Sequence, residues 1–168
     1  MNQSGSAIEL CMKNGNVYRI QLCIEPETSH TPEYLRGQLE HGMAGLSSQS
    51  RWQRFASSVN TLSKEQLDYL SNIDGINHIA WCASILQDGK ERGIAIARYV
   101  KLPDDVGVAE FAITVMDKYQ GQGIGYELLN KLLESASANG LSTLRGYVVS
   151  GNRRMLNLCK QYGASIQK

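Results

Sequence analysis

The sequence predicts one domain of the α/β (α+β) class, in which helices flank a mixed, mainly antiparallel central sheet. Its 168 residues are enough for a single domain over 1–168 with its own core, and too few for two. Apolar runs with strand-like composition recur at 77–85, 92–100 and 109–116, while apolar residues after the last of them repeat at helical spacing. This order of runs indicates a sheet with helices on its faces.

The chain is predicted to begin with a hairpin and a helix. Alternating apolar runs surround the Asn-Gly-Asn sequence at 14–16, a composition that favours the positive backbone angles of a tight turn. Thr31 and Pro32 then have the residue types of a helix start. Gly42 offers an end to that helix.

The remaining elements follow from caps, turns and periodicity. Ser63 and Gln66 fit a capping box, which predicts a helix over 63–72. The Asp-Gly pair at 88–89 marks a tight turn, so the apolar runs on either side of it are expected to form adjacent antiparallel strands. The last four expected elements are a strand, a helix, a strand and a helix, at 109–116, 124–139, 143–150 and 152–162.

Composition and charge exclude several classes of protein. The net charge is +1, with 17 basic residues scattered among 16 acidic ones, so we expect no nucleic-acid partner. No apolar stretch approaches membrane-spanning length and no secretory signal pattern opens the chain, which predicts a cytoplasmic protein with no membrane partner. The four cysteines form no CxxC pair, so we expect reduced thiols rather than a disulfide or a metal site.

The heptad YQGQGIG at 119–125 stands between a predicted strand and a predicted helix. Small residues at such a turn let backbone N–H groups face a concavity at the positive end of a helix dipole, which attracts phosphate. A nucleotide-hydrolase loop would need Gly-Lys-Ser/Thr at its end, and a dinucleotide fingerprint would need Gly or Ala in place of Tyr126. The first motif is therefore excluded and the second is disfavoured, while a turn that needs glycine only for packing stays open.

The hexad at 120–125 fits the pattern Q/R-x-x-G-x-G/A, and on this motif the chain resembles the GNAT superfamily of acetyl-CoA-dependent N-acetyltransferases. The resemblance covers most of the chain, since AEFAITV is similar to the central strand of that family and NRRMLNLCKQYGA to its late helix. LSSQSRWQRF and LSKEQLDYLSNIDGINHIAWCA add a likeness to the acetyltransferase domain of bacterial Pat-type protein lysine acetyltransferases. The resemblance implies the GNAT acyl-CoA N-acyltransferase fold.

The resemblance also implies acetyl-CoA as the acyl donor and a set of residues that bind it. The main chain of Ile113 and Val115 matches the positions that hold the pantetheine arm, although their side chains are expected in the core. Asn152 matches a cofactor-side asparagine, a role compatible with that of a helix N-cap. The residues expected at the pyrophosphate are Gln120, Gly121, Gln122, Gly123, Ile124 and Gly125, with Tyr126 close by.

Glu110 is the acid of the Pat-type central strand and the expected general base. A lysine amine has a pKa of about 10.4 in water, so a base must remove its proton before attack. Because Glu110 lies among Ala109, Phe111 and Ala112, we expect partial burial to raise its pKa toward the working range. A solvated strand charge is the alternative interpretation.

The general acid and the end of the sheet are left open by the sequence. The position at which many superfamily members carry a tyrosine is Cys159, and Tyr162 lies directly before Gly163, so no acid is assigned. After the last helix the chain has room for one short strand at most. We expect either a short edge to the sheet or its completion by a partner chain, as in a homodimer.

The expected activity is the transfer of an acetyl group from acetyl-CoA to a primary amine, most favourably a lysine of a protein. The alternatives are a small-molecule amine acceptor and a catalytically silent CoA-binding regulatory module. The sequence does not identify the acceptor or the preferred acyl chain, because such grooves are built from variable loops.

Overall fold

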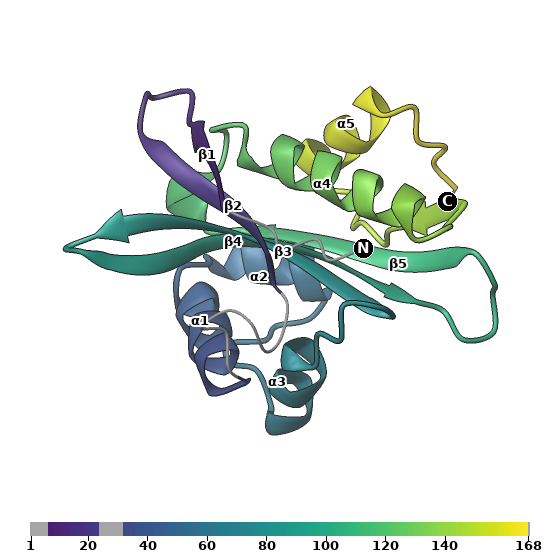
Figure 1. Cartoon of the computed structure of the whole chain (residues 1–168), viewed down its shortest axis with the longest axis horizontal. Helices are drawn as coiled ribbons and strands as arrows, with labels where there is room; N and C mark the ends of the chain where they lie inside the picture. The colour runs from purple at the N-terminus through teal and green to yellow at the C-terminus, as the bar shows by residue number, and fades with distance from the viewer. Residues whose placement is uncertain (1–6, 24–31, 168) are drawn as a thin grey trace.

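The computed structural model describes residues 7–23 and 32–167. Its sheet has six strands in the order β1-β2-β3-β4-β5-β6 (Figure 1). The strands are β1 (Ile8–Cys11), β2 (Val17–Cys23), β3 (His78–Gln87), β4 (Lys90–Lys101), β5 (Val108–Val115) and β6 (Thr143–Arg145). The helices are α1 (Pro32–Ala44), α2 (Ser48–Phe55), α3 (Lys64–Ser71), α4 (Ile124–Ala138) and α5 (Arg153–Gln161), with a 3₁₀ turn at Asp117–Tyr119.

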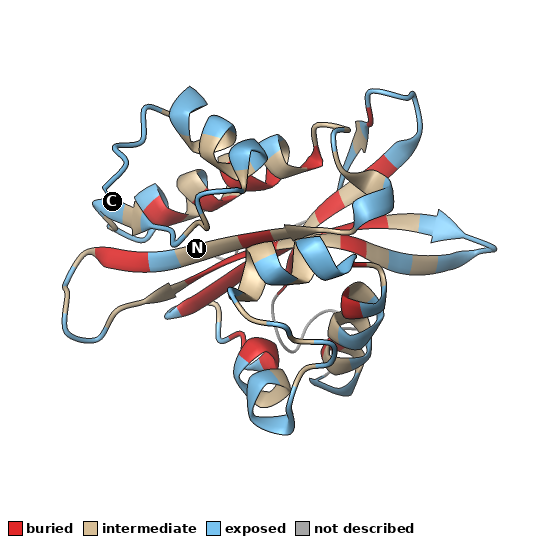
Figure 2. Ribbon diagram, turned by 180° about the vertical axis from the view of Figure 1, so that it is seen from behind, coloured by how far each residue is buried: buried red, intermediate tan, exposed pale blue. Residues whose placement is uncertain are grey.

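The helices cover both faces of the sheet. α4 and α5 lie on one face, and α1, α2 and α3 lie on the other (Figure 1). α4 turns an apolar stripe to the sheet, as the red segments in Figure 2 show, and this stripe forms the main core with residues of β2 to β5. A smaller core joins α1 to the opposite face through Leu35, Ile73 and Ala80. The predicted mixed, mainly antiparallel sheet flanked by helices is therefore confirmed.

The pairing of β5 opens the sheet at one place. β1 to β5 pair antiparallel, and β5 pairs with β4 along Ala109–Val115. On its other side β5 pairs in parallel with β6, and only from Val108 to Glu110. After Arg145 the chain leaves the sheet at Gly146, where a side chain would collide with the Phe111 ring because a Cβ atom would lie 2.7 Å from it. The rest of that β5 edge has no strand partner among the described residues.

Several local predictions are confirmed. The turn at 14–16 joins β1 to β2, with Gly15 at φ +87° and Cys11 paired with Val17. Ser63 and Gln66 form the reciprocal capping box at the start of α3. α4 and α5 lie where the periodicity places them. These features are local, so neighbouring residues suffice to specify them.

Other predictions need correction. α1 continues through Gly42 to Ala44, so this glycine is inside the helix, while Thr31 lies outside the described residues. The strand expected over 143–150 is limited to β6, because the chain turns away at Gly146. α2 was not predicted, although Ser47 caps it by accepting a hydrogen bond from Ser50 N. In the described C-terminus, 162–167 add no strand, which leaves the short edge formed by β6.

The expectation of four reduced thiols is wrong for one pair. Cys23 in β2 and Cys82 in β3 form a disulfide, while Cys11 and Cys159 are free. Cys23 pairs with Ala80 in the register of the two strands, so Cys82 is its diagonal neighbour on the same face of the sheet. This proximity depends on strand pairing across 59 residues, which cysteine spacing does not reveal. Within the described ranges no helix is long and apolar enough to cross a membrane.

Candidate active site

A cleft of about 610 Å³ lies beside the edge of β5 that β6 leaves unpaired. Its walls come from β5, the start of α4, the segment at 146–149 and the start of α5, with α2 at one end. It exists because the chain turns away after β6 while β5 continues to Val115. Of the residues predicted to act on the cofactor or substrate, it brings together Glu110, Ile113, Val115, Gln120, Gly121, Gly123, Ile124, Gly125 and Asn152.

The glycine loop forms the end of the cleft at the start of α4. Gly121 has φ +75° and Gly123 has φ +91°, a left-handed conformation that glycine adopts without strain. Gly123 caps α4 without a side-chain hydrogen bond, so the first N–H groups of the helix are not satisfied by a cap. Gly125 has a different role, because a Cβ there would lie 3.7 Å from Leu158 and α4 approaches α5 closely. The loop has the geometry of an anion-binding helix start.

Gln120 connects this loop to β5, α2 and α5 by side-chain hydrogen bonds. Its Nε2 lies 3.0 Å from the carbonyl oxygen of Val115 and 3.2 Å from Ser50 Oγ in α2. Its Oε1 accepts a hydrogen bond of 2.9 Å from Arg154 Nη1 in α5. Arg154 also lines the cleft, so a cation that the sequence analysis did not single out stands near the glycines. The signal available for it was a basic residue in the first turn of the last helix.

Gln122 and Tyr126 do not line the cleft. Gln122 Oε1 accepts a hydrogen bond from Asn14 N at 3.0 Å, and its carbonyl accepts one from Lys13 N at 3.3 Å, so it anchors the β1–β2 turn. Tyr126 packs its ring against Tyr162, with the ring centroids 5.4 Å apart. Their side chains therefore support the loop from outside.

Asn152 and the end of β5 both line the cleft. Asn152 caps α5, because its Oδ1 accepts a hydrogen bond of 3.2 Å from Met155 N. The side chains of Ile113 and Val115 belong to the core on the α4 face, as expected for their alternation along the strand. These two residues contribute main-chain groups to the cleft, along the unpaired edge of β5.

Glu110 lies where the paired and unpaired parts of β5 meet. It is opposite Val100 in β4 and Arg145 in β6, and it lines the cleft. Its side chain is exposed, so the expected partial burial is wrong. The reason is alternation along the strand: Ala109 turns toward the core under α4, and Glu110 points to the other face.

Arg54 is a functional candidate that the sequence analysis did not identify. It comes from the last turn of α2, and its Nε donates a hydrogen bond of 3.1 Å to Thr114 Oγ1. Burial lowers the pKa of Arg54, and the negative charge of Glu110 opposes that shift. The guanidinium therefore lies within electrostatic reach of the proposed base. The segment LSSQSRWQRF, which contains Arg54, was singled out only for its likeness to Pat-type domains.

Arg98 is a second buried cation, close enough to Arg54 to be affected by its charge. Arg98 in β4 is opposite Ala112 in β5 and only 4% exposed. It donates hydrogen bonds to the Leu70 carbonyl at 2.6 Å and to His78 Nε2 at 3.2 Å. Burial, followed by the nearby Arg54 charge, lowers the pKa of Arg98 to about 9. Burial and the charge of Arg98 lower the pKa of His78 to about 4, so this histidine is neutral at pH 7 and structural.

Neither candidate for the general acid lines the cleft. Burial raises the pKa of the Cys159 thiol. Burial also raises the pKa of Tyr162, whose hydroxyl donates a hydrogen bond to Asn130 Oδ1. No group of three or more metal-ligating side chains occurs in the part of the chain that the structure describes. The cleft thus contains the glycine helix start with Arg154, the unpaired edge of β5 and the exposed carboxylate of Glu110.

Residues 48–164 match the family model described as Acetyltransferase (GNAT) family, and the chain belongs to this family. An acetyltransferase of Pseudomonas aeruginosa is 33% identical over 118 residues, which cover 70% of this chain and 63% of the relative. The acetyltransferase Pat of Mycolicibacterium smegmatis is 33% identical over 134 residues, which cover 77% of this chain and 39% of the relative. The chain therefore spans less than two thirds of the length of either relative.

Solved structures show the same fold. The GNAT domain of Pat from S. lividans superposes with a TM-score of 0.79 over 96% of this chain and 89% of that one, at 20% identity. A cAMP-binding acyltransferase from Mycobacterium smegmatis superposes with a TM-score of 0.62 over 96% of this chain and 44% of that one, at 26% identity.

Proposed function

We propose that the protein transfers an acetyl group from acetyl-CoA to a primary amine, and that the favoured acceptor is a lysine side chain of another protein. The observation that carries the proposal is the glycine helix start at Gly121–Gly125, which opens onto the cleft beside the unpaired edge of β5. Membership of the GNAT family supports the same chemistry.

In this proposal the cofactor lies along the cleft, with its diphosphate at the start of α4 and its thioester toward Glu110. Its diphosphate meets the N–H groups at the start of α4, where the helix dipole and Arg154 both favour negative charge. The pantetheine arm runs along the open edge of β5 and hydrogen-bonds to the main chain of Ile113 and Val115. The thioester then lies near Ala112, between Glu110 and Thr114 on the face that α2 covers.

Glu110 takes the amine proton, directly or through a water molecule, which frees the nitrogen lone pair. The nitrogen attacks the thioester carbon and forms the N–C bond. The C–S bond then breaks and its electron pair leaves with the CoA thiolate, which takes a proton from solvent. Arg54 lies within electrostatic reach of Glu110, beside the place proposed for the thioester.

The exposure of Glu110 supports a large acceptor. A carboxylate at the solvent-facing end of the cleft is accessible to a side chain that projects from another protein. A base for a small amine would more often be enclosed, because small-molecule sites bury most of the ligand. The favoured acceptor is therefore a flexible, solvent-exposed lysine.

The test is to incubate the protein with acetyl-CoA and a panel of proteins and small amines, and to find by mass spectrometry which molecule gains about 42 Da, the mass of one acetyl group. Glu110→Gln should lower kcat/KM by about 10²–10⁴-fold and leave the Kd for CoA nearly unchanged. Transfer only to small amines would replace the protein acceptor in this proposal. Tight CoA binding without turnover on any amine would indicate a silent CoA-binding module.

A further inference from the structure

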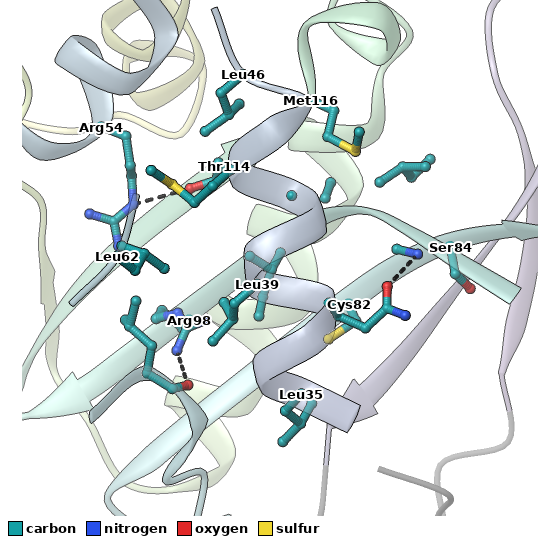
Figure 3. Close-up of a pocket in the computed structure, with 18 of the residues that line it drawn as sticks. Leu35, Leu39, Leu46, Arg54, Leu62, Cys82, Ser84, Arg98, Thr114 and Met116 are labelled. Carbon is teal, nitrogen blue, oxygen red and sulfur yellow. Dashed lines mark hydrogen bonds between the residues drawn. The ribbon is translucent and has the colours of Figure 1, made fainter. Parts of the chain in front are cut away.

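A second cavity, of about 90 Å³, lies between α1 and the opposite face of the sheet. Figure 3 shows Leu35 and Leu39 on the α1 side, and Cys82, Arg98 and Thr114 on the strands beneath. Its lining is mainly apolar. The apolar residues that line it include Leu35, Leu39, Met43, Leu46 and Phe55.

Gly42 accounts for part of this hollow. Leu35, Leu39 and Gly42 line the cavity at spacings of four and three residues, which place them on the sheet-facing side of α1. Gly42 is half-buried, and no heavy atom lies within 4 Å of the position a Cβ would take. Glycine inside a helix is destabilising relative to alanine. Here it also leaves unfilled space on the face where a side chain would normally pack.

The cavity is too large for an ordinary packing defect. One water position takes about 10–15 Å³ of such volume, so the cavity of about 90 Å³ has room for about six to nine, whereas protein interiors contain few voids larger than one water. Polar side chains also line it, but Gln38 already accepts a hydrogen bond from Gly93 N, and Glu91 accepts one from Ser84 Oγ. Mainly apolar cavities accept apolar ligands. The occupant that fits is therefore an aliphatic group of about four to six heavy atoms.

The cavity adjoins the cofactor cleft. Four residues line both hollows: Leu46, Arg54, Phe55 and Thr114. The hydrogen bond from Arg54 to Thr114 marks this junction (Figure 3). Thr114 is two residues from Ala112 on the same strand face, beside the place proposed for the thioester. An aliphatic tail attached to the thioester carbon would therefore point from the cleft into the cavity.

We propose that the cavity between α1 and the sheet is an acyl-chain subsite, so that the enzyme accepts CoA thioesters whose aliphatic tail beyond the carbonyl carbon has about four to six carbons, as in hexanoyl-CoA. This proposal rests on the proposed acyltransferase function. The chemical step is the same: the N–C bond forms, the C–S bond breaks, the thiolate leaves and the amine proton passes to Glu110. Only the group carried by the carbonyl carbon differs.

An acyl group that ends in a carboxylate is the competing ligand, because Arg54 and Arg98 also line the cavity. Their contacts argue against it. Arg98 already donates to the Leu70 carbonyl and to His78, and Arg54 already donates to Thr114. A carboxylate would also have to leave water for a mainly apolar space, which is unfavourable unless it is fully paired. An uncharged aliphatic tail has no such cost.

The first experiment compares acetyl-, butyryl-, hexanoyl- and succinyl-CoA with the wild-type chain. Kd is measured by calorimetry, and kcat/KM with one saturating amine identified with acetyl-CoA. We expect hexanoyl-CoA to bind at least about tenfold more tightly than acetyl-CoA, because each buried methylene adds affinity. Equal Kd values for acetyl- and hexanoyl-CoA, or tightest binding of succinyl-CoA, would overturn the proposal.

The second experiment fills the cavity. Gly42→Leu should remove the hexanoyl preference, with a loss of about tenfold or more in affinity, and leave acetyl-CoA within about twofold of wild type. Gly42→Ala should have an intermediate effect. The matched control is Gly37→Leu, since Gly37 lies on the exposed side of the same helix, also with no atom within 4 Å of a Cβ. Both leucine variants should raise Tm by about 2–4 °C, because both remove a helical glycine.

The outcomes separate this proposal from the function on which it rests. If the wild type transfers acetyl but Gly42→Leu keeps the hexanoyl preference, the subsite is refuted and the acetyltransferase function stands. If no thioester supports transfer but hexanoyl-CoA binds more tightly than acetyl-CoA in a manner sensitive to Gly42→Leu, the subsite stands and the transferase function is refuted.

Discussion

The two faces of the sheet are built differently. Under α4 the packing is complete, and Leu128 and Leu132 are both fully buried at 0% exposure. Under α1, α2 and α3 the buried set includes Arg98 and His78, and the α1 side leaves a cavity. Polar groups and empty space cost stability inside a protein. The comparison indicates that the α4 face supplies most of the stability, while the other face tolerates the features that a reaction needs.

The largest expected effect tests the packed face. Leu128→Ala should lower the free energy of unfolding by about 2–5 kcal/mol, because it removes a fully buried side chain and leaves a void. Leu35→Ala, at a residue that lines the cavity and is 5% exposed, is the matched substitution on the other face and should have a smaller effect. Urea unfolding measures both. If the two losses are equal, the faces do not differ in packing as we describe.

The polar face should make stability depend on pH. Burial and the charge of Arg98 lower the pKa of His78 to about 4, below the ordinary value of about 6.5. Between these values the unfolded chain binds the proton and the folded chain does not, so stability is present above pH 6.5 and is lost as pH falls toward 4. We expect this histidine to contribute a loss of about 1–2 kcal/mol between pH 7 and pH 5.

Urea unfolding at pH 7 and pH 5 measures this contribution. His78→Gln should lower stability at pH 7, because it changes the partner of Arg98, and should flatten the pH dependence by that amount. His41→Gln is the control, since His41 is exposed near the end of α1. An unchanged slope in His78→Gln would show that other groups cause the dependence.

The smallest expected effect sharpens the comparison at the loop where α4 begins. Gly123→Ala places a Cβ at φ +91° and should weaken CoA binding about tenfold, because the strained loop no longer aims its N–H groups. Gly140→Ala imposes a similar strain at φ +72°, after the other end of α4 and away from the cleft. Calorimetry should show a change in Kd only for Gly123→Ala. A similar change in both variants would indicate general destabilisation.

Much of the fold follows from local chemistry in the sequence. The Asn-Gly-Asn turn, the capping box of Ser63 and Gln66, and the apolar stripe of α4 each depend on residues a few positions apart. The glycine loop that precedes α4 is predictable from the sequence for the same reason. Gly121 and Gly123 have positive φ angles, which favour glycine at these positions. From these local features the sequence predicts the family, the fold class and the proposed phosphate site.

The tertiary structure alone decided what surrounds that loop. The early end of β6 opens the cleft, the pairing of β2 with β3 brings Cys23 to Cys82, and the docking of α2 brings Arg54 to Thr114. The hollow beside Gly42 also depends on which elements pack against α1. Each results from contacts between residues far apart in the chain, and no local pattern encodes the distance or the volume between such residues.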